Sequence, residues 1–212
     1  DQGFLGHVQS RFRHFDFGPD LALQVDQVGF FGCSLGTKHI HPRLDGATLE
    51  DGHLDTDAEG RVVLADALHY AKTEYDPCAI IDLATLTGAC VVALGRWASG
   101  LFANNSRLSD RIRKAGDTTA ELAWPLPLLE GHKKAVKSPV ADVKNTGAGR
   151  EAGSSTAAAF LAAFAGETPW AHLDIAGTAW TSHTSPIQPR GATGVGVRLL
   201  LELLSDWKSP KL

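Results

Sequence analysis

The stretch CAIIDLATLTGACVVAL (residues 78–94) decides the fold class of this 212-residue chain. Its first six residues are apolar except for Asp82, which predicts a buried strand. Residues 85–88 then form a strand-to-helix turn, and the small residues 89–94 begin a helix. A buried strand that leads directly into a helix is the unit from which α/β folds are built.

The same alternation of strands and helices continues on both sides of this stretch, from residue 55 onward. Apolar residues recur at helical spacing over residues 62–75, where Asp76-Pro77 ends the helix. No element is predicted before Asp55, although residues 28–33 have the composition of a short buried strand. The other expected elements are strands at 98–103 and 170–177, an extended segment at 124–127, a loop at 140–149, a helix at 106–115 capped by Ser106, a helix at 157–164 capped by Ser154 or Ser155, and a helix within 194–207.

This order of elements predicts an α/β fold with a mainly parallel or mixed sheet flanked by helices. In such sheets, ligands bind at the carboxyl ends of the strands. The turns that follow Leu83 and Ile175 are therefore the first candidates for a functional site.

The composition excludes several classes of protein. Apolar residues make up 43% and charged residues 21%, which excludes collagen, coiled coils and intrinsic disorder. The formal net charge is −4 and the basic residues are scattered, so no nucleic-acid partner is expected. No apolar run reaches about 18 residues, so no membrane partner is expected.

The cysteines indicate the compartment of the protein, and the missing methionine indicates how the chain was produced. Three cysteines without a C-x-x-C motif, and no secretory signal, predict reduced thiols in the cytoplasm. Methionine is absent, even at position 1, which indicates a processed, truncated or fragmentary chain.

The densest chemical signal is DTDAEGR (residues 55–61), in which three acids alternate with small residues. In an extended segment, Asp57 and Glu59 project to the same side and can converge on a cation. Gly60 permits a sharp turn. Arg61 supplies a fixed positive charge that can hold an anion near the metal.

Two other interpretations of these acids remain open at this point. The acids could form a solvated turn before a helix, where negative charge favours the positive helix end. They could also begin a calcium loop, because acids and a glycine occupy positions 1, 3, 5, 6 and 12 of an EF-hand-like spacing over residues 55–66. Pro42, Gly46 and Gly52 make a poor incoming helix for such a loop, and its twelfth position holds Asp instead of Glu.

Five blocks in order resemble the leucyl (cytosol) aminopeptidase family. They are DAEGRVVLADAL (57–68), ATLTGA (84–89), NTG (145–147), WAHLDIAG (170–177) and GATG (191–194). The resemblance covers residues 55–205 and implies an aminopeptidase-like α/β/α sandwich that is incomplete here. It further implies a metal-dependent, cytoplasmic aminopeptidase that releases apolar, leucine-like residues from peptide substrates and assembles as a homo-oligomer, typically a hexamer.

The resemblance also implies roles for individual residues. Asp57 binds one of two divalent metal ions, zinc or manganese, and Glu59 binds both. Arg61 holds a bicarbonate ion that acts as general base. The residues that border the substrate are Thr85, Leu86, Gly88 and Ala176.

The first 54 residues depart from the family pattern. The family has three further metal ligands and a catalytic lysine upstream, and neither of their motifs occurs here. The pair His39 and His41 is a poor substitute beside Pro42. The domain prediction is therefore an atypical segment, 1–54, followed by the C-terminal part of the catalytic domain, 55–212. A non-catalytic or fragmentary relative, and a calcium- or anion-binding module, stay open as alternative functions.

Overall fold

A computed structural model describes the backbone of residues 22–25, 44–45, 56–145, 151–186, 188–207 and 210, and the side chains of these ranges from residue 60 onward. The strands are β1 (Ala22–Val25), β2 (Leu44–Asp45), β3 (Ile80–Ala84), β4 (Ser99–Ala103), β5 (Ala123–Pro125), β6 (Val143–Lys144), β7 (Trp170–Asp174), β8 (Trp180–Thr181) and β9 (Gly191–Ala192). The helices are α2 (Thr56–Tyr75), α3 (Gly88–Leu94), α4 (Ser106–Thr119), α5 (Glu130–Ala135), α6 (Gly153–Ala165) and α7 (Val197–Ser205).

The main sheet has five strands in the order β1-β3-β7-β4-β5. β1, β3 and β7 run parallel, β4 runs antiparallel to β7, and β5 runs parallel to β4. The sheet is therefore mixed, which confirms the predicted α/β class. Two small ladders, β2–β6 and β8–β9, lie outside it.

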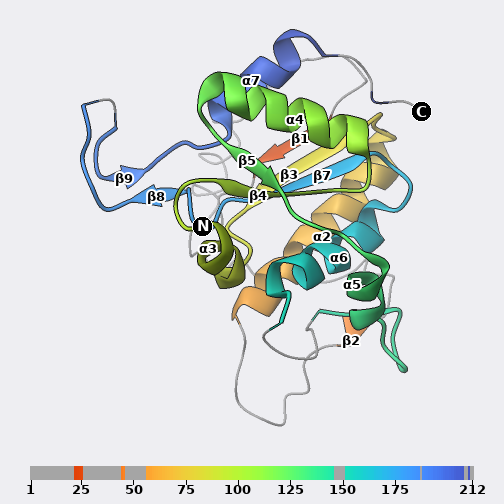
Figure 1. Ribbon diagram of the computed structural model, residues 1–212. Helices are drawn as coiled ribbons and strands as arrows, with labels where there is room; N and C mark the ends of the chain where they lie inside the picture. The colour runs from red at the N-terminus through yellow and green to blue at the C-terminus, as the bar shows by residue number, and fades with distance from the viewer. Residues whose placement is uncertain are drawn as a thin grey trace, which may run out of the picture.

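Helices cover both faces of this sheet (Figure 1). α2 and α6 pack on one face, over a core cluster that includes Leu68, Phe160 and Trp170. α4 and α7 pack on the other face, over a cluster that includes Ile112 and Leu199. The neighbouring strands β3 and β7 are buried along their whole length, as the apolar runs of the sequence predict. Of the helices in the part of the chain that the structure describes, none combines the length and apolar content needed to cross a membrane.

The predicted helices and strands from residue 62 onward are confirmed, with corrections at two helix ends. The cap of α4 is Asn105, whose side chain accepts from the N–H of Leu108 at 3.0 Å, and not Ser106. α6 begins after Ala152, which has a left-handed backbone, and neither Ser154 nor Ser155 caps it. Both serines are buried residues of the first turn of α6, a helix whose residues are mostly buried in the apolar core.

The absence of any element before residue 55 was a wrong prediction. β1 pairs with β3, with Ala22 opposite Ile80, and β2 pairs with β6. Strands of four and two residues are too short to show a recognisable alternation of apolar and polar residues. They become strands because they pair with β3 and β6 in the folded chain. The suggested strand at 28–33 lies outside the described residues.

Candidate active site

The turns that follow β3 and β7 meet at one buried carboxylate. The two strands are parallel neighbours, and Ala84 is paired with Asp174 at their carboxyl ends. Asp174 is fully buried. Its Oδ1 accepts from the backbone N–H of Leu86 at 3.2 Å and of Ala176 at 3.1 Å, and its Oδ2 accepts from the hydroxyl of Thr87 at 2.7 Å. One side chain thus holds together the two turns that the sequence indicated as ligand sites.

Thr87 extends this connection to α3 and α6. Its hydroxyl caps α3 by accepting from the N–H of Cys90 at 3.1 Å, and it lies 3.1 Å from the hydroxyl of Ser154 in the first turn of α6. Because Thr87 gives its one hydroxyl proton to Asp174, Ser154 is the donor in the second contact. Burial, followed by the charge of Asp174, raises the pKa of Cys90 to about 11, so this cysteine is a neutral thiol at pH 7.

The four residues predicted to border a substrate lie in these turns or at the start of α3. Thr85 and Gly88 are exposed, Ala176 is partly buried, and Leu86 is buried in the core cluster beneath α2 and α6. Asp174 brings the two groups of residues together, although they are far apart in the sequence. Their contact with a substrate stays a prediction.

The acidic cluster lies at the beginning of α2, which corrects the extended geometry expected for it. Asp57 and Glu59 stand on helical backbone, where residues two apart lie about 200° apart around the helix axis. Their side chains lie outside the described residues. The helix also counts against the calcium loop, because residues 56–66 would have to form a non-helical loop to wrap a calcium ion.

Arg61 connects the first turns of α2 to the loop after β6. It is partly buried, and its Nη1 donates to the backbone carbonyl of Asn145. α2 ends just before β3 begins, so its first turns lie toward the end at which β3 finishes (Figure 1). Arg61 and the turn after β3 therefore lie at the same end of the sheet.

A metal site is not complete in the part of the chain that the structure describes. Among the side chains described, no three of His, Cys, Asp and Glu come together so as to hold an ion. Asp57 and Glu59 are oxygen donors of a suitable kind, but two carboxylates do not hold a pair of divalent ions in a catalytic geometry. These residues alone do not fit the pair of ions that the resemblance implies.

A second buried polar group lies on the same two strands. Asp82 of β3 and His172 of β7 are paired in the ladder, and Asp82 binds the Nδ1 of His172 and accepts from the Nε1 of Trp170 at 2.7 Å. The histidine ring is stacked with Trp170 and Phe102. Burial alone would lower the pKa of His172, but the charge and hydrogen bond of Asp82, with the charge of Asp174, raise it above its ordinary value of 6.5. His172 is therefore a buried residue that packs within its strand and is paired there with Asp82.

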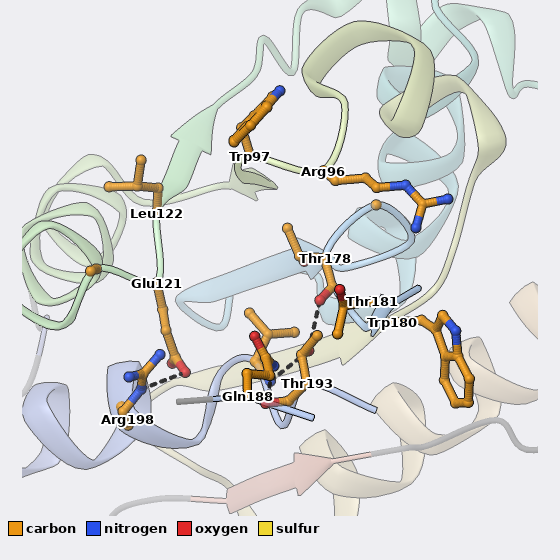
Figure 2. A pocket seen from close by; sticks show the side chains of 13 residues that line it. Arg96, Trp97, Glu121, Leu122, Thr178, Trp180, Thr181, Gln188, Thr193 and Arg198 are labelled. Atoms are coloured by element: carbon orange, nitrogen blue, oxygen red, sulfur yellow. Dashed lines mark hydrogen bonds and ion pairs between the residues drawn. The ribbon is translucent and has the colours of Figure 1, made fainter. Parts of the chain in front are cut away.

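A cavity of about 230 Å³ lies beside the turn after β7. Figure 2 shows it between the ion pair of Glu121 and Arg198 and the aromatic rings of Trp97 and Trp180. Thr178, which follows the turn, also lines the cavity. Sequence reasoning missed this cavity because four segments distant in the chain build it.

Comparison with known families shows what this chain is similar to. The domain described as "Cytosol aminopeptidase family, catalytic domain" matches residues 34–201. The chain belongs to the cytosol aminopeptidase family. The match begins upstream of residue 55, and the domain boundary at that position stays a prediction.

Relatives from distant organisms carry the same family name. A "Probable cytosol aminopeptidase" of Roseiflexus castenholzii is 63% identical over 155 residues, which is 73% of this chain and 31% of the relative. One from Geobacter sp. is 56% identical over 192 residues, covering 87% of this chain and 38% of the relative. One from Cenarchaeum symbiosum is 48% identical over 192 residues, covering 85% and 39%. The chain thus spans between three and four tenths of the length of these cytosol aminopeptidases.

Proposed function

We propose that the protein to which this chain belongs is a metal-dependent aminopeptidase that releases apolar, leucine-like residues from the N-terminus of peptides by two-metal hydrolysis. The observation that carries the proposal is the junction of the turns after β3 and β7 at Asp174, within a chain of the cytosol aminopeptidase family. Thr85, Leu86, Gly88 and Ala176 would border the substrate there. Ala89 and Ala176, which are both partly buried, are small and apolar, which suits an apolar terminal residue.

Asp57 and Glu59 would supply two of the metal ligands, and the other ligands would come from parts of the protein outside the described residues. Bound zinc or manganese ions lower the pKa of water and polarise a carbonyl group. Arg61 would hold an anion, bicarbonate by the resemblance, as a general base. Its guanidinium is suited to this because it is permanently charged and the Asn145 carbonyl orients it.

Hydrolysis of a leucine anilide with added manganese or zinc tests the proposal. We expect little or no turnover from the 212-residue chain alone, because the motifs that carry the family's remaining ligands do not occur in its sequence. We expect turnover from a longer form that carries the remaining ligands. Robust activity of the 212-residue chain would mean that residues 1–54 supply ligands in a way the sequence does not indicate.

Two substitutions in an active form separate the roles of the acidic cluster and the arginine. Glu59→Gln should abolish activity and lower the metal content, whereas Glu74→Gln, an exposed change in the same helix, should leave both unchanged. Arg61→Ala should lower turnover far more than it lowers metal content. Equal loss of metal in the Arg61 variant would show that this arginine supports the metal site and does not serve the base.

We also propose that the protein is cytoplasmic and forms a homo-oligomer, a hexamer by the resemblance. The term "cytosol" in the names of the relatives supports the first point. Exposed aromatic residues support the second, since Trp124 in the edge strand β5 is 60% exposed and Trp97, between α3 and β4, is 86% exposed. Light scattering after size exclusion tests the assembly. A monodisperse species near 22.5 kDa that unfolds cooperatively would contradict it.

A further inference from the structure

We infer that Asp174 is a positioning residue that sets the separation of the two substrate-bordering turns, and so determines how tightly the enzyme binds the N-terminal residue of a peptide. The inference rests on the proposed function. Asp174 is fully buried at the carboxyl end of β7, and it lies between the turn that carries Leu86 and the turn that carries Ala176.

The hydrogen bonds of Asp174 fix the backbone of both turns. One carboxylate oxygen accepts from the N–H of Leu86 and from the N–H of Ala176, so the distance between these two peptide groups depends on a single atom. Each peptide group is planar, so holding the N–H also fixes the direction of the preceding carbonyl. Bonds to a carboxylate are about twice as strong as bonds between neutral groups.

The second carboxylate oxygen secures the start of α3. It accepts from the hydroxyl of Thr87, which caps that helix and contacts Ser154 of α6. On the other side, the turn after β7 packs closely against the backbone of Gly95, because an added Cβ at Gly177 would overlap the carbonyl oxygen of Gly95. The turn after β7 therefore packs against Gly95 on one side, and on the other side both turns are hydrogen-bonded to Asp174.

Asp82 provides a matched control for this role. It is also a buried aspartate, on the neighbouring strand β3, and its partners are His172 and Trp170. Among the described residues, its side chain forms no hydrogen bond to either turn, while its removal disturbs the same sheet. A loss of stability should therefore occur when either aspartate is substituted. A loss of substrate binding should occur only when Asp174 is substituted.

The experiment compares Asp174→Asn and Asp82→Asn in the catalytically active form, with leucine anilide as substrate. In Asp174→Asn, the amide nitrogen takes the place of the oxygen that accepts from Thr87, so this contact must reverse its direction, and all the contacts lose the carboxylate charge. We expect kcat/KM to fall about 10- to 100-fold through a higher KM, because misplacement of a binding group by about 1 Å has effects of this size. Metal content should be unchanged in both variants, and KM should be unchanged in Asp82→Asn.

A wild-type KM in Asp174→Asn, an equal rise of KM in Asp82→Asn, or loss of metal from Asp174→Asn would each overturn the inference. If Asp174→Asn does not fold, Thr87→Val and Thr87→Ser decide instead. Serine keeps the hydroxyl and should keep the wild-type KM, whereas valine should raise it, and equal KM values would overturn the inference.

Amide exchange gives a readout that does not depend on activity. In the wild-type chain, the N–H groups of Leu86 and Ala176 should exchange slowly, and both should exchange faster in Asp174→Asn, while the N–H of Ile81 should not change. Unchanged exchange at Leu86 and Ala176 would overturn the inference. A wild-type enzyme without aminopeptidase activity would refute the proposed function, whereas an active wild type with an unchanged Asp174→Asn variant would refute only the role of Asp174.

Discussion

Gly116 in α4 provides a quantitative test of the packing around the cavity. An added Cβ at this position would lie 2.7 Å from the backbone carbonyl oxygen of Glu121 and 3.2 Å from the backbone nitrogen of Ala123. Real Cβ atoms essentially never approach another atom more closely than 3.0 Å. The neighbouring atoms belong to the backbone, so no change of rotamer can make room.

Two effects of Gly116→Ala oppose each other. Alanine favours a helix over glycine by about 1 kcal/mol. Overpacking against fixed atoms costs about 1–3 kcal/mol. We expect the clash to prevail and the free energy of unfolding to fall by up to about 2 kcal/mol, which lowers the melting temperature of a chain of this size by up to about 8 °C.

The assay is thermal unfolding followed by circular dichroism, with Gly131→Ala as the matched control. Gly131 lies in α5, it is exposed, and an added Cβ there meets no atom within 4 Å. The same substitution should therefore stabilise the chain by about 0.5–1 kcal/mol at this position. If Gly116→Ala raises the melting temperature as Gly131→Ala does, the close approach of α4 to the start of β5 is wrong.

Three further predictions concern buried ionisable groups. Glu121→Gln should lower the free energy of unfolding in urea by about 1.5–3 kcal/mol, because Glu121 accepts from the backbone N–H of Gly196, which precedes α7, from that of Leu199 in α7, and from Arg198. An unchanged urea midpoint would contradict this. The raised pKa of His172 stabilises the fold below pH 6.5, and this stabilisation should be lost as pH rises through the folded-state pKa; His172→Gln should flatten that part of the pH–stability curve, and an unaltered curve would count against the ion pair. With a pKa of about 11, Cys90 should resist iodoacetamide at pH 8, and mass spectrometry that finds its peptide labelled within minutes would show that the thiol is accessible.

The sequence alone determined the fold class and the order of its main elements. Buried strands are recognisable from apolar runs such as residues 78–83, and helices from apolar residues at helical spacing such as residues 62–75, because both signals are local. The blocks that resemble the family also located the candidate site, since the turns after β3 and β7 carry the predicted residues Leu86 and Ala176.

Only the tertiary structure decided how these turns are connected. Asp174 bonds to Leu86 and Thr87 across more than eighty positions of the chain, and the pair of Asp82 and His172 forms because β3 and β7 are neighbours in the sheet. In the sequence, Asp174 is one acid among 24, and nothing local distinguishes it from an exposed carboxylate. Burial and the identity of hydrogen-bond partners depend on which strands lie side by side, and that order follows from the packing of the whole domain.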